Sequence, residues 1–407
     1  MAKLIHIDGR TGEGGGQLVR LAIGLSAVTT RPVKIANIRG NRPSKGSSGG
    51  GLKNQHVTSI RWLADVTEAD VEGLRVGSTT LTFIPRRKPS QLVQRNFKIT
   101  AESGAASTLL ILQAILPFCV FAGNESNEPV VLDIVGGTNV SFSLSYEYLD
   151  QVLLPTLEDR FGIVVERQLK SRAWSLGSSG KGEITIKVHP LQPKQALQFR
   201  TRDFVYPTSW QLKSVNVTII TPSLSHSTLQ VEIVARLEQL FPTVDITFKA
   251  TEDSGNVARW YILLVATSTD GLRWGHDILV SMPKKTKSPD KFAAQVAQQV
   301  CKGLDKEIQV RGQVDEHLQD QIVCFQGLCS GLSSMPRGSL PTETPSVSVD
   351  EQGFLSANIE NMRREKGLQP FGHGSLHTQT AHWIVKELLP EVQFFAKGDV
   401  VQGIGWV

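Results

Sequence analysis

A pattern that recurs along the chain is the feature that most constrains its fold: a helix pattern, then a strand pattern, then a glycine-containing exit. In residues 17–41 apolar residues three and four apart precede a short strand pattern and Gly40-Asn41. The same order returns in residues 103–139, which end at Gly137-Thr138-Asn139, and more loosely in residues 315–400. Such recurrence predicts repeated α/β units that share one core. The alternative is that any α/β protein contains runs of this kind.

Residues 190–285 have a different character. One strand pattern, one helix pattern and two further strand patterns follow each other there, between two copies of the repeat. We interpret this segment as an inserted small α/β domain. The sequence therefore predicts an α/β (α+β) fold with a large repeated-unit domain, residues 1–189 and 286–407, and an insert at 190–285.

Two stretches have the composition of flexible loops. Within residues 333–347, nine of fifteen residues are Ser, Thr or Pro, a composition that buries too little apolar surface to order itself. We expect a flexible insertion over residues 331–370. The glycine- and serine-rich residues 44–51 are expected to form a flexible connector.

Composition excludes some classes of protein and leaves others open. The net charge is +5, from 43 basic and 38 acidic residues, which gives only a weak general attraction for polyanions. No apolar run approaches the roughly 18 residues of a membrane helix, and the first residues lack the pattern of a signal peptide. Four cysteines give no disulfide framework, so we expect reduced thiols in a nuclear or cytosolic protein.

The strongest local motif is the glycine-rich segment 8–17, which follows a strand pattern at 4–7 and opens a helix pattern. Bare backbone N–H groups at a helix start bind anions. Glu13 would repel a phosphate in this loop unless a divalent metal lay between the two, and oxygen ligands suit magnesium or manganese. The alternative is a tight turn with a solvated Glu13.

A second motif is a series of basic and amide side chains at strand exits and helix starts. Arginine holds phosphate oxygens through two-point contacts, whereas few aromatic residues are present to stack a long single strand. The alternative is a solvated charged face. The residues are Arg20 on the first predicted helix, Arg39 and Arg42 after the next strand, Lys45, and then Lys53, Gln55 and His56 at the following helix start.

Two further motifs contain histidine. In segment 315–321 helical spacing places His317, Asp320 and Gln321 on one face, although acidic residues are also common at a helix start. In segment 374–380 His377 lies among hydroxyl residues just before a helix pattern, where an imidazole could act as a nucleophile. The alternative there is a structural histidine.

Taken together, these motifs resemble the RNA 3′-terminal phosphate cyclase family. The resemblance rests on DGRTGEGGGQLVRLA, IRGNRP with a later Gln-His pair, SGAASTLLILQ, GGTN, DEHLQDQ and SLHTQT, which occur in family order across nearly the whole chain. It implies three repeated βαβαββ-like units with a smaller inserted α/β domain. It also implies a ligase that uses ATP to adenylylate a histidine and passes AMP to an RNA 3′-phosphate. The neighbouring 2′-hydroxyl then closes a 2′,3′-cyclic phosphate, and AMP leaves.

The resemblance also implies roles for individual residues. His377 matches the adenylylated histidine, and Glu13 matches the acidic residue that helps to hold magnesium or manganese on the triphosphate. The positions implied for binding the nucleotide are Gln113, Asp320, Gln321 and His317, the last standing where some relatives carry an aromatic hydroxyl. The positions implied for the phosphate of the RNA end are Arg20, Arg39, Arg42, Gln55 and His56.

The sequence departs from the family pattern after GGTN, where VSFSLS replaces a stretch with Trp and Pro, and in the lengthened loop at 44–51. Two other functions stay open: a cyclase-like protein without catalysis in pre-rRNA processing and ribosome biogenesis, and, more distantly, a carboxyvinyl transferase. The presence of His377 and Glu13 favours the enzyme. We expect ATP and RNA with a 3′-phosphate as partners, no membrane association, and location in the nucleoplasm or nucleolus with the cytoplasm as a second compartment. The oligomeric state stays open.

Overall fold

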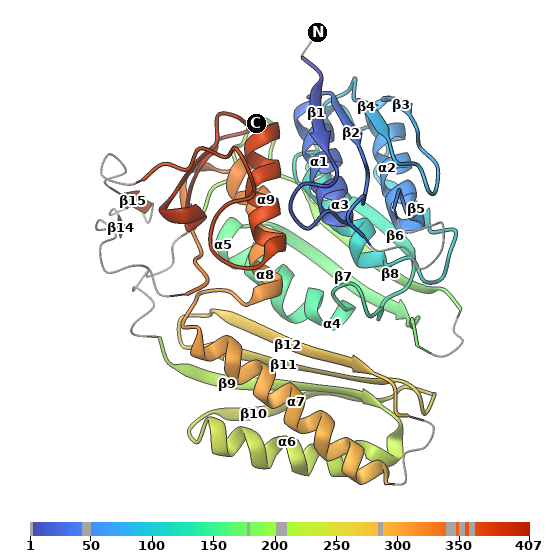
Figure 1. The fold of residues 1–407 in the computed structure, drawn as a ribbon, viewed down its shortest axis with the longest axis vertical. Coiled ribbons are helices and arrows are strands. Elements are labelled where there is room, and N and C mark those ends of the chain that lie inside the picture. The colour runs from blue at the N-terminus through green and yellow to red at the C-terminus, as the bar shows by residue number, and fades with distance from the viewer. Residues whose placement is uncertain are drawn as a thin grey trace.

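A computed structural model of the chain describes most of its residues (Figure 1). It places three repeated units around a shared set of helices, with a smaller sheet and two helices below them in the view. In the part of the chain that is described, no helix is both long enough and apolar enough to cross a bilayer. The described residues are 3–42, 50–176, 180–200, 210–283, 288–338, 347–349, 355–357 and 363–407.

The first unit forms a four-stranded sheet in the order β1-β2-β4-β3. Strands β1 and β2 are parallel, and the remaining neighbours are antiparallel. Each of the first two strands is followed by a helix, so the unit reads βαβαββ. Its elements are β1 (Ile5–Asp8), α1 (Gly16–Thr29), β2 (Val33–Ala36), α2 (Asn54–Thr67), β3 (Asp70–Glu72) and β4 (Leu81–Ile84).

The second unit repeats this topology, with a sheet in the order β5-β6-β8-β7 and one parallel pair, β5 with β6. A five-residue stretch of wider helical turn, Leu149–Leu153, joins its α4 to its α5. The elements are β5 (Asn96–Thr100), α3 (Thr108–Val120), β6 (Val130–Gly136), α4 (Tyr146–Tyr148), α5 (Leu154–Phe161), β7 (Val164–Ser171) and β8 (Gly182–His189).

The third unit has a sheet in the order β13-β17-β16. Its first strand is reduced to an isolated parallel bridge between Gln198 and Ser330, where the Ser330 N–H donates to the Leu197 carbonyl at 2.7 Å. The insert therefore interrupts this unit between its first strand and its first helix. The other elements are α8 (Glu316–Leu328), β13 (Ser330–Ser334), α9 (Leu376–Leu388), β16 (Gln393–Phe395) and β17 (Val400–Ile404). The predicted α/β fold with repeated units is confirmed.

The insert forms a four-stranded sheet in the order β10-β9-β11-β12, with helices α6 and α7 packed together on it. It has its own hydrophobic core, which runs from Trp210 to Ile308. Because α7 contributes its buried face to this core, the core extends past residue 285. The elements are β9 (Leu212–Thr221), α6 (His226–Leu240), β10 (Asp245–Asp253), β11 (Trp260–Ser268), β12 (Arg273–Val280) and α7 (Pro289–Gln309).

The two stretches expected to be flexible lie largely outside the described residues, which leave out 43–49 and much of 339–362. The described part of 331–370 includes most of β13 and a two-stranded antiparallel pair, β14 (Val347–Val349) and β15 (Leu355–Ala357).

Helix α1 packs between helices of the other two units and is buried along nearly its whole length. It packs against α3 of the second unit and α9 of the third, and α9 packs against α8. Side chains cap the starts of α3, α8 and α9, namely Ser107, Asp315 and Ser375. The start of α1 follows Gly15 and has no side-chain cap, so its first backbone N–H groups remain available to another acceptor.

Candidate active site

A cavity of about 310 Å³ opens where the three units meet. Helix α3, residues 141–144, the start of α8 and the start of α9 form its walls, and Asp277 reaches it from β12 of the insert. The cavity brings together six residues singled out from the sequence, although they come from four different helices. They are Arg20, Gln113, His317, Asp320, Gln321 and His377.

The glycine-rich loop packs tightly against the start of α9 and against itself. Gly12 has a left-handed backbone, with φ of +66°, and a Cβ there would lie 2.1 Å from Thr380 Oγ1. A Cβ on Gly15 would lie 2.1 Å from the Glu13 carboxylate. Since the Glu13 N–H donates to Thr380 Oγ1 at 3.0 Å, the loop is fixed to the helix that carries His377. The left-handed backbone and the contact with Thr380 favour glycine at position 12, and a side chain at position 15 would displace the Glu13 carboxylate.

Glu13 is a buried carboxylate with a cationic partner. Its side chain is 5% exposed and forms an ion pair with Arg42. Its Oε1 lies 3.9 Å from His377 Nδ1. Within the described ranges, no group of three or more His, Cys, Asp or Glu side chains could hold a metal ion. A metal at Glu13 would therefore take one protein carboxylate and complete its shell from substrate phosphates and water.

A chain of hydrogen bonds connects α1, α3 and α8 along one wall. Arg20 donates from Nε to Gln113 Oε1 at 2.5 Å. Gln113 donates from Nε2 to Gln321 Oε1 at 2.7 Å, and Gln321 donates to Asp320 Oδ1 at 3.1 Å. The chain fixes the orientation of both amides, because each uses its oxygen as acceptor and its nitrogen as donor.

A second chain leads from Asp320 to His377 through Gln17. The Gln17 amide donates from Nε2 to Asp320 Oδ2, and its Oε1 lies 3.0 Å from His377 Nδ1. Sequence reasoning missed Gln17, although its spacing from Arg20 places both on one face of a helix that begins at the glycine loop. It also missed Thr380 and Asp277, whose contacts with the site cross units and leave no local signal.

Burial governs the ionisation of Asp320 and Arg20 in the wall. Burial raises the pKa of Asp320, against the hydrogen bond from Gln321 and the nearby His377, His317 and Arg20. Burial lowers the pKa of Arg20 to about 10, although Asp320 and Glu13 oppose this shift. Arg20 therefore stays charged near neutral pH and presents a cation to the cavity.

The remaining predicted residues lie outside the lining of the cavity, and His56 lies beside the start of α1, where a Cβ on Gly16 would be 2.5 Å from its Nε2. Arg39 Nη1 and His56 Nε2 are buried and have no hydrogen-bond partner in the described structure. Burial, with Arg20, Arg39 and Lys53 nearby, lowers the pKa of His56 well below its usual value. Because the Lys53 N–H donates to His56 Nδ1 at 3.0 Å, the neutral ring carries its proton on Nε2. Two unused donors thus lie near the uncapped helix start. Gln55 is half-buried on the first turn of α2.

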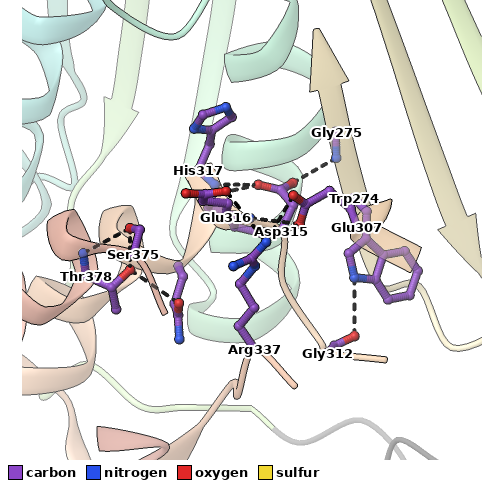
Figure 2. Close-up of polar contacts among 12 residues, drawn as sticks. Trp274, Gly275, Glu307, Gly312, Asp315, Glu316, His317, Arg337, Ser375 and Thr378 are labelled. Atoms are coloured by element: carbon purple, nitrogen blue, oxygen red, sulfur yellow. Dashed lines mark hydrogen bonds and ion pairs between the residues drawn. The ribbon is translucent and has the colours of Figure 1, made fainter. Parts of the chain in front are cut away.

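The start of α8 is held against the insert (Figure 2). Buried Asp315 accepts from the His317 and Leu318 N–H groups at 2.9 and 2.8 Å, and from the Gly275 N–H of β12 at 2.7 Å. Arg337 pairs with Glu307 of α7 at 3.1 Å. Figure 2 shows His317 pointing away from Arg337. The junction thus fixes the helix turn from which His317 reaches the cavity.

The stretch that departs from the family pattern forms part of the cavity wall. Ser141, Phe142, Ser143 and Leu144 all line the cavity. The Phe142 side chain is 54% exposed, which is unusual for a large apolar ring and leaves its face open to the cavity and to solvent. The stretch therefore contributes directly to the lining of the cavity.

Comparison with known proteins finds a matching family and similar sequences. The family profile described as RNA 3′-terminal phosphate cyclase matches residues 11–394. A protein of Thermococcus sibiricus named RNA 3′-terminal phosphate cyclase is 33% identical over 80% of this chain and 86% of its own length. A Drosophila melanogaster protein of the same name is 30% identical over 86% of this chain and 91% of its own length.

Proposed function

Because the chain belongs to the RNA 3′-terminal phosphate cyclase family, we propose that it converts an RNA 3′-terminal phosphate to a 2′,3′-cyclic phosphate with ATP, through a covalent histidine–AMP intermediate on His377. One observation carries the assignment of the nucleophile. His377 lines the cavity while its Nδ1 is within hydrogen-bond distance of Gln17, so Nε2 is the ring nitrogen left for attack.

In the first step Nε2 of His377 attacks the α-phosphorus of ATP. The N–P bond forms as the bond from that phosphorus to the bridging oxygen breaks, and pyrophosphate leaves with the electron pair. Arg20, buried and charged in the wall, would stabilise the negative charge on the phosphates.

In the second step an oxygen of the RNA 3′-phosphate attacks the same phosphorus. AMP is transferred and the N–P bond to His377 breaks, which leaves a phosphoanhydride at the RNA end. The neighbouring 2′-hydroxyl then attacks the 3′-phosphorus, loses its proton and expels AMP. The protein's task in this step is to hold the RNA end.

The residues around Glu13 fit a magnesium or manganese ion that is carried mainly by the nucleotide. Such an ion would neutralise phosphate charge and take the Glu13 carboxylate as its protein ligand. Arg42 supplies a cation to the same carboxylate, so Glu13 is paired before substrate binds.

The RNA 3′-phosphate is proposed to bind beside the start of α1. Arg39 and His56 each bury a nitrogen without a partner in the described structure, and Lys53 and Arg42 lie close by. Buried polar groups are normally satisfied, so two unsatisfied N–H donors at a helix start favour an anionic ligand. Contacts to phosphate carry no sequence information, so the enzyme should act on RNA ends of any sequence.

We also propose a role in RNA processing in the nucleus. The four cysteines are free and buried, as expected for a protein in a reducing compartment. The alternative role, a non-catalytic factor in ribosome assembly, would not need a nucleophile, whereas here His377 sits at the cavity with its Nδ1 oriented.

The test is incubation of the purified protein with ATP labelled at the α-phosphate and a divalent metal. We expect a covalent, acid-labile nucleotide adduct, and conversion of a 3′-phosphorylated oligoribonucleotide to its cyclic form. His377→Ala should form no adduct and keep its circular dichroism spectrum. A wild-type protein that binds ATP but forms no adduct would contradict the proposal.

A further inference from the structure

The Gln17 amide forms hydrogen bonds with Asp320 and His377, and its orientation determines which end of the amide faces the histidine. Gln17 is 1% exposed and lies between Asp320 and His377. Its amide can satisfy the two neighbours in only one orientation if Asp320 is an acceptor, because a glutamine has one donor end and one acceptor end. With Nε2 donating to Asp320, the oxygen must face the imidazole.

The second hydrogen bond to Asp320 supports this orientation. Gln321 also donates to the carboxyl group, at 3.1 Å, and its own oxygen is used by Gln113. Asp320 is therefore held as an acceptor from two sides. Burial raises its pKa, and the hydrogen bond donated by Gln321 together with the nearby Arg20 opposes this rise.

We infer that Gln17 is a positioning residue that selects the protonation form of His377, with Asp320 acting on the histidine through it. An amide oxygen accepts and cannot donate, so a hydrogen bond at 3.0 Å requires a proton on His377 Nδ1. The neutral ring then has its lone pair on Nε2, the nitrogen required for attack.

This inference rests on the proposed function and gives Asp320 a different task from direct contact with the nucleotide. Both of its oxygens accept from glutamine side chains. In the adenylylation step the N–P bond forms at Nε2, and the proton stays on Nδ1 because an amide oxygen is too weak a base to remove it. The adduct is thus a charged imidazolium, which makes the histidine a good leaving group when AMP passes to RNA.

The first measurement is the protonation form of His377 in the wild-type protein, read from ¹⁵N NMR of histidine-labelled protein, with His377→Ala to assign the signal. We expect the neutral ring to carry its proton on Nδ1. A proton found on Nε2 overturns the inference whether or not the protein forms an adduct. Absence of the adduct in the wild type would instead contradict the proposed function, so the two failures are distinguishable.

The second measurement uses Gln17→Met, which keeps the length of the side chain and removes both hydrogen bonds. We expect adduct formation to slow at least tenfold with little change in KM for ATP, and the His377 signal to show a mixture of the two neutral forms. Gln17→Glu restores an acceptor. It should retain the Nδ1 proton, because a carboxylate oxygen accepts the same hydrogen bond.

The matched control is Gln319→Met. Gln319 is also a buried glutamine between α8 and α9, where its Oε1 accepts from Thr378 Oγ1 at 3.2 Å, but it does not contact His377. We expect its loss to leave the histidine signal as in the wild type. If Gln17→Met forms adduct at the wild-type rate, or if Gln319→Met changes the His377 signal as much as Gln17→Met does, the inference is wrong.

Discussion

Arg20 and Gln113, which are 93 residues apart in the sequence, share a 2.5 Å hydrogen bond across the candidate active site. The two residues come from α1 and α3, the equivalent first helices of the first and second repeated units. The wall of the cavity is thus built by contact between repeats. Because the bond uses only Nε of Arg20, the terminal nitrogens of the guanidinium remain for a phosphate.

We predict that Arg20→Gln slows adduct formation about 10- to 100-fold, which corresponds to the roughly 1.5–3 kcal/mol of a hydrogen bond to a charged group. The measurement is the rate of adduct formation at saturating labelled ATP. Arg31→Gln is the control, because Arg31 follows the same helix but pairs with Glu391 at the surface. Equal rates for the two variants would contradict the assignment.

We predict that Glu13→Gln raises the concentration of magnesium or manganese needed for adduct formation. The amide keeps the shape of the side chain but removes the negative charge of the carboxylate proposed to bind the metal. Binding of 3′-phosphorylated RNA should change little. Metal titrations of adduct formation, alongside RNA binding by fluorescence anisotropy, check this. An unchanged metal requirement would mean that the Glu13 carboxylate serves to pair with Arg42 and does not bind the metal.

The repeats and the site residues on single helices could be predicted because they depend on local spacing. Helix starts at 108 and 316 follow from apolar periodicity and a capping residue, Ser107 and Asp315. Similarly, His317, Asp320 and Gln321 share a face by helical geometry alone. These residues come together at the cavity because the repeated units share one hydrophobic core.

Contacts that span the chain could not be predicted in the same way. Gln17 contacts Asp320 and His377, which are 303 and 360 residues away in the sequence. The residues near position 17 therefore give no indication of either partner. The first strand of the third unit is a single bridge at Gln198, so no strand pattern marks it. The extension of the insert's core through α7 could not be predicted either, because a helix pattern does not reveal which sheet will cover its apolar face.

We predict that Arg39→Ala weakens the use of every 3′-phosphorylated RNA about equally and leaves adduct formation from ATP near the wild-type rate. The guanidinium buries Nη1 without a partner in the described structure and lies outside the cavity lining, so it is free for the RNA end. The measurement is cyclisation of oligonucleotides that differ in sequence and in the terminal ribose or deoxyribose. An equal loss of adduct formation would show that Arg39 serves ATP instead.

We predict that His382→Gln flattens the acid side of the stability curve. The His382 ring is buried and stacks on Phe371, and its Nδ1 donates a hydrogen bond to the Phe371 carbonyl oxygen at 3.2 Å. Burial lowers the pKa of His382 to about 4. Since the folded protein takes up this proton less readily than the unfolded chain, the free energy of unfolding falls as the pH drops from about 6.5 to about 4, by about 3 kcal/mol. Glutamine can donate to the same carbonyl but does not titrate.

The measurement is urea unfolding across this pH range. The variant should be less stable than the wild type near neutral pH, and the difference should shrink toward pH 4. The control, His6→Gln at an exposed position, should follow the wild type. Parallel curves for His382→Gln and the wild type would mean that the folded protein protonates His382 as easily as the unfolded chain does.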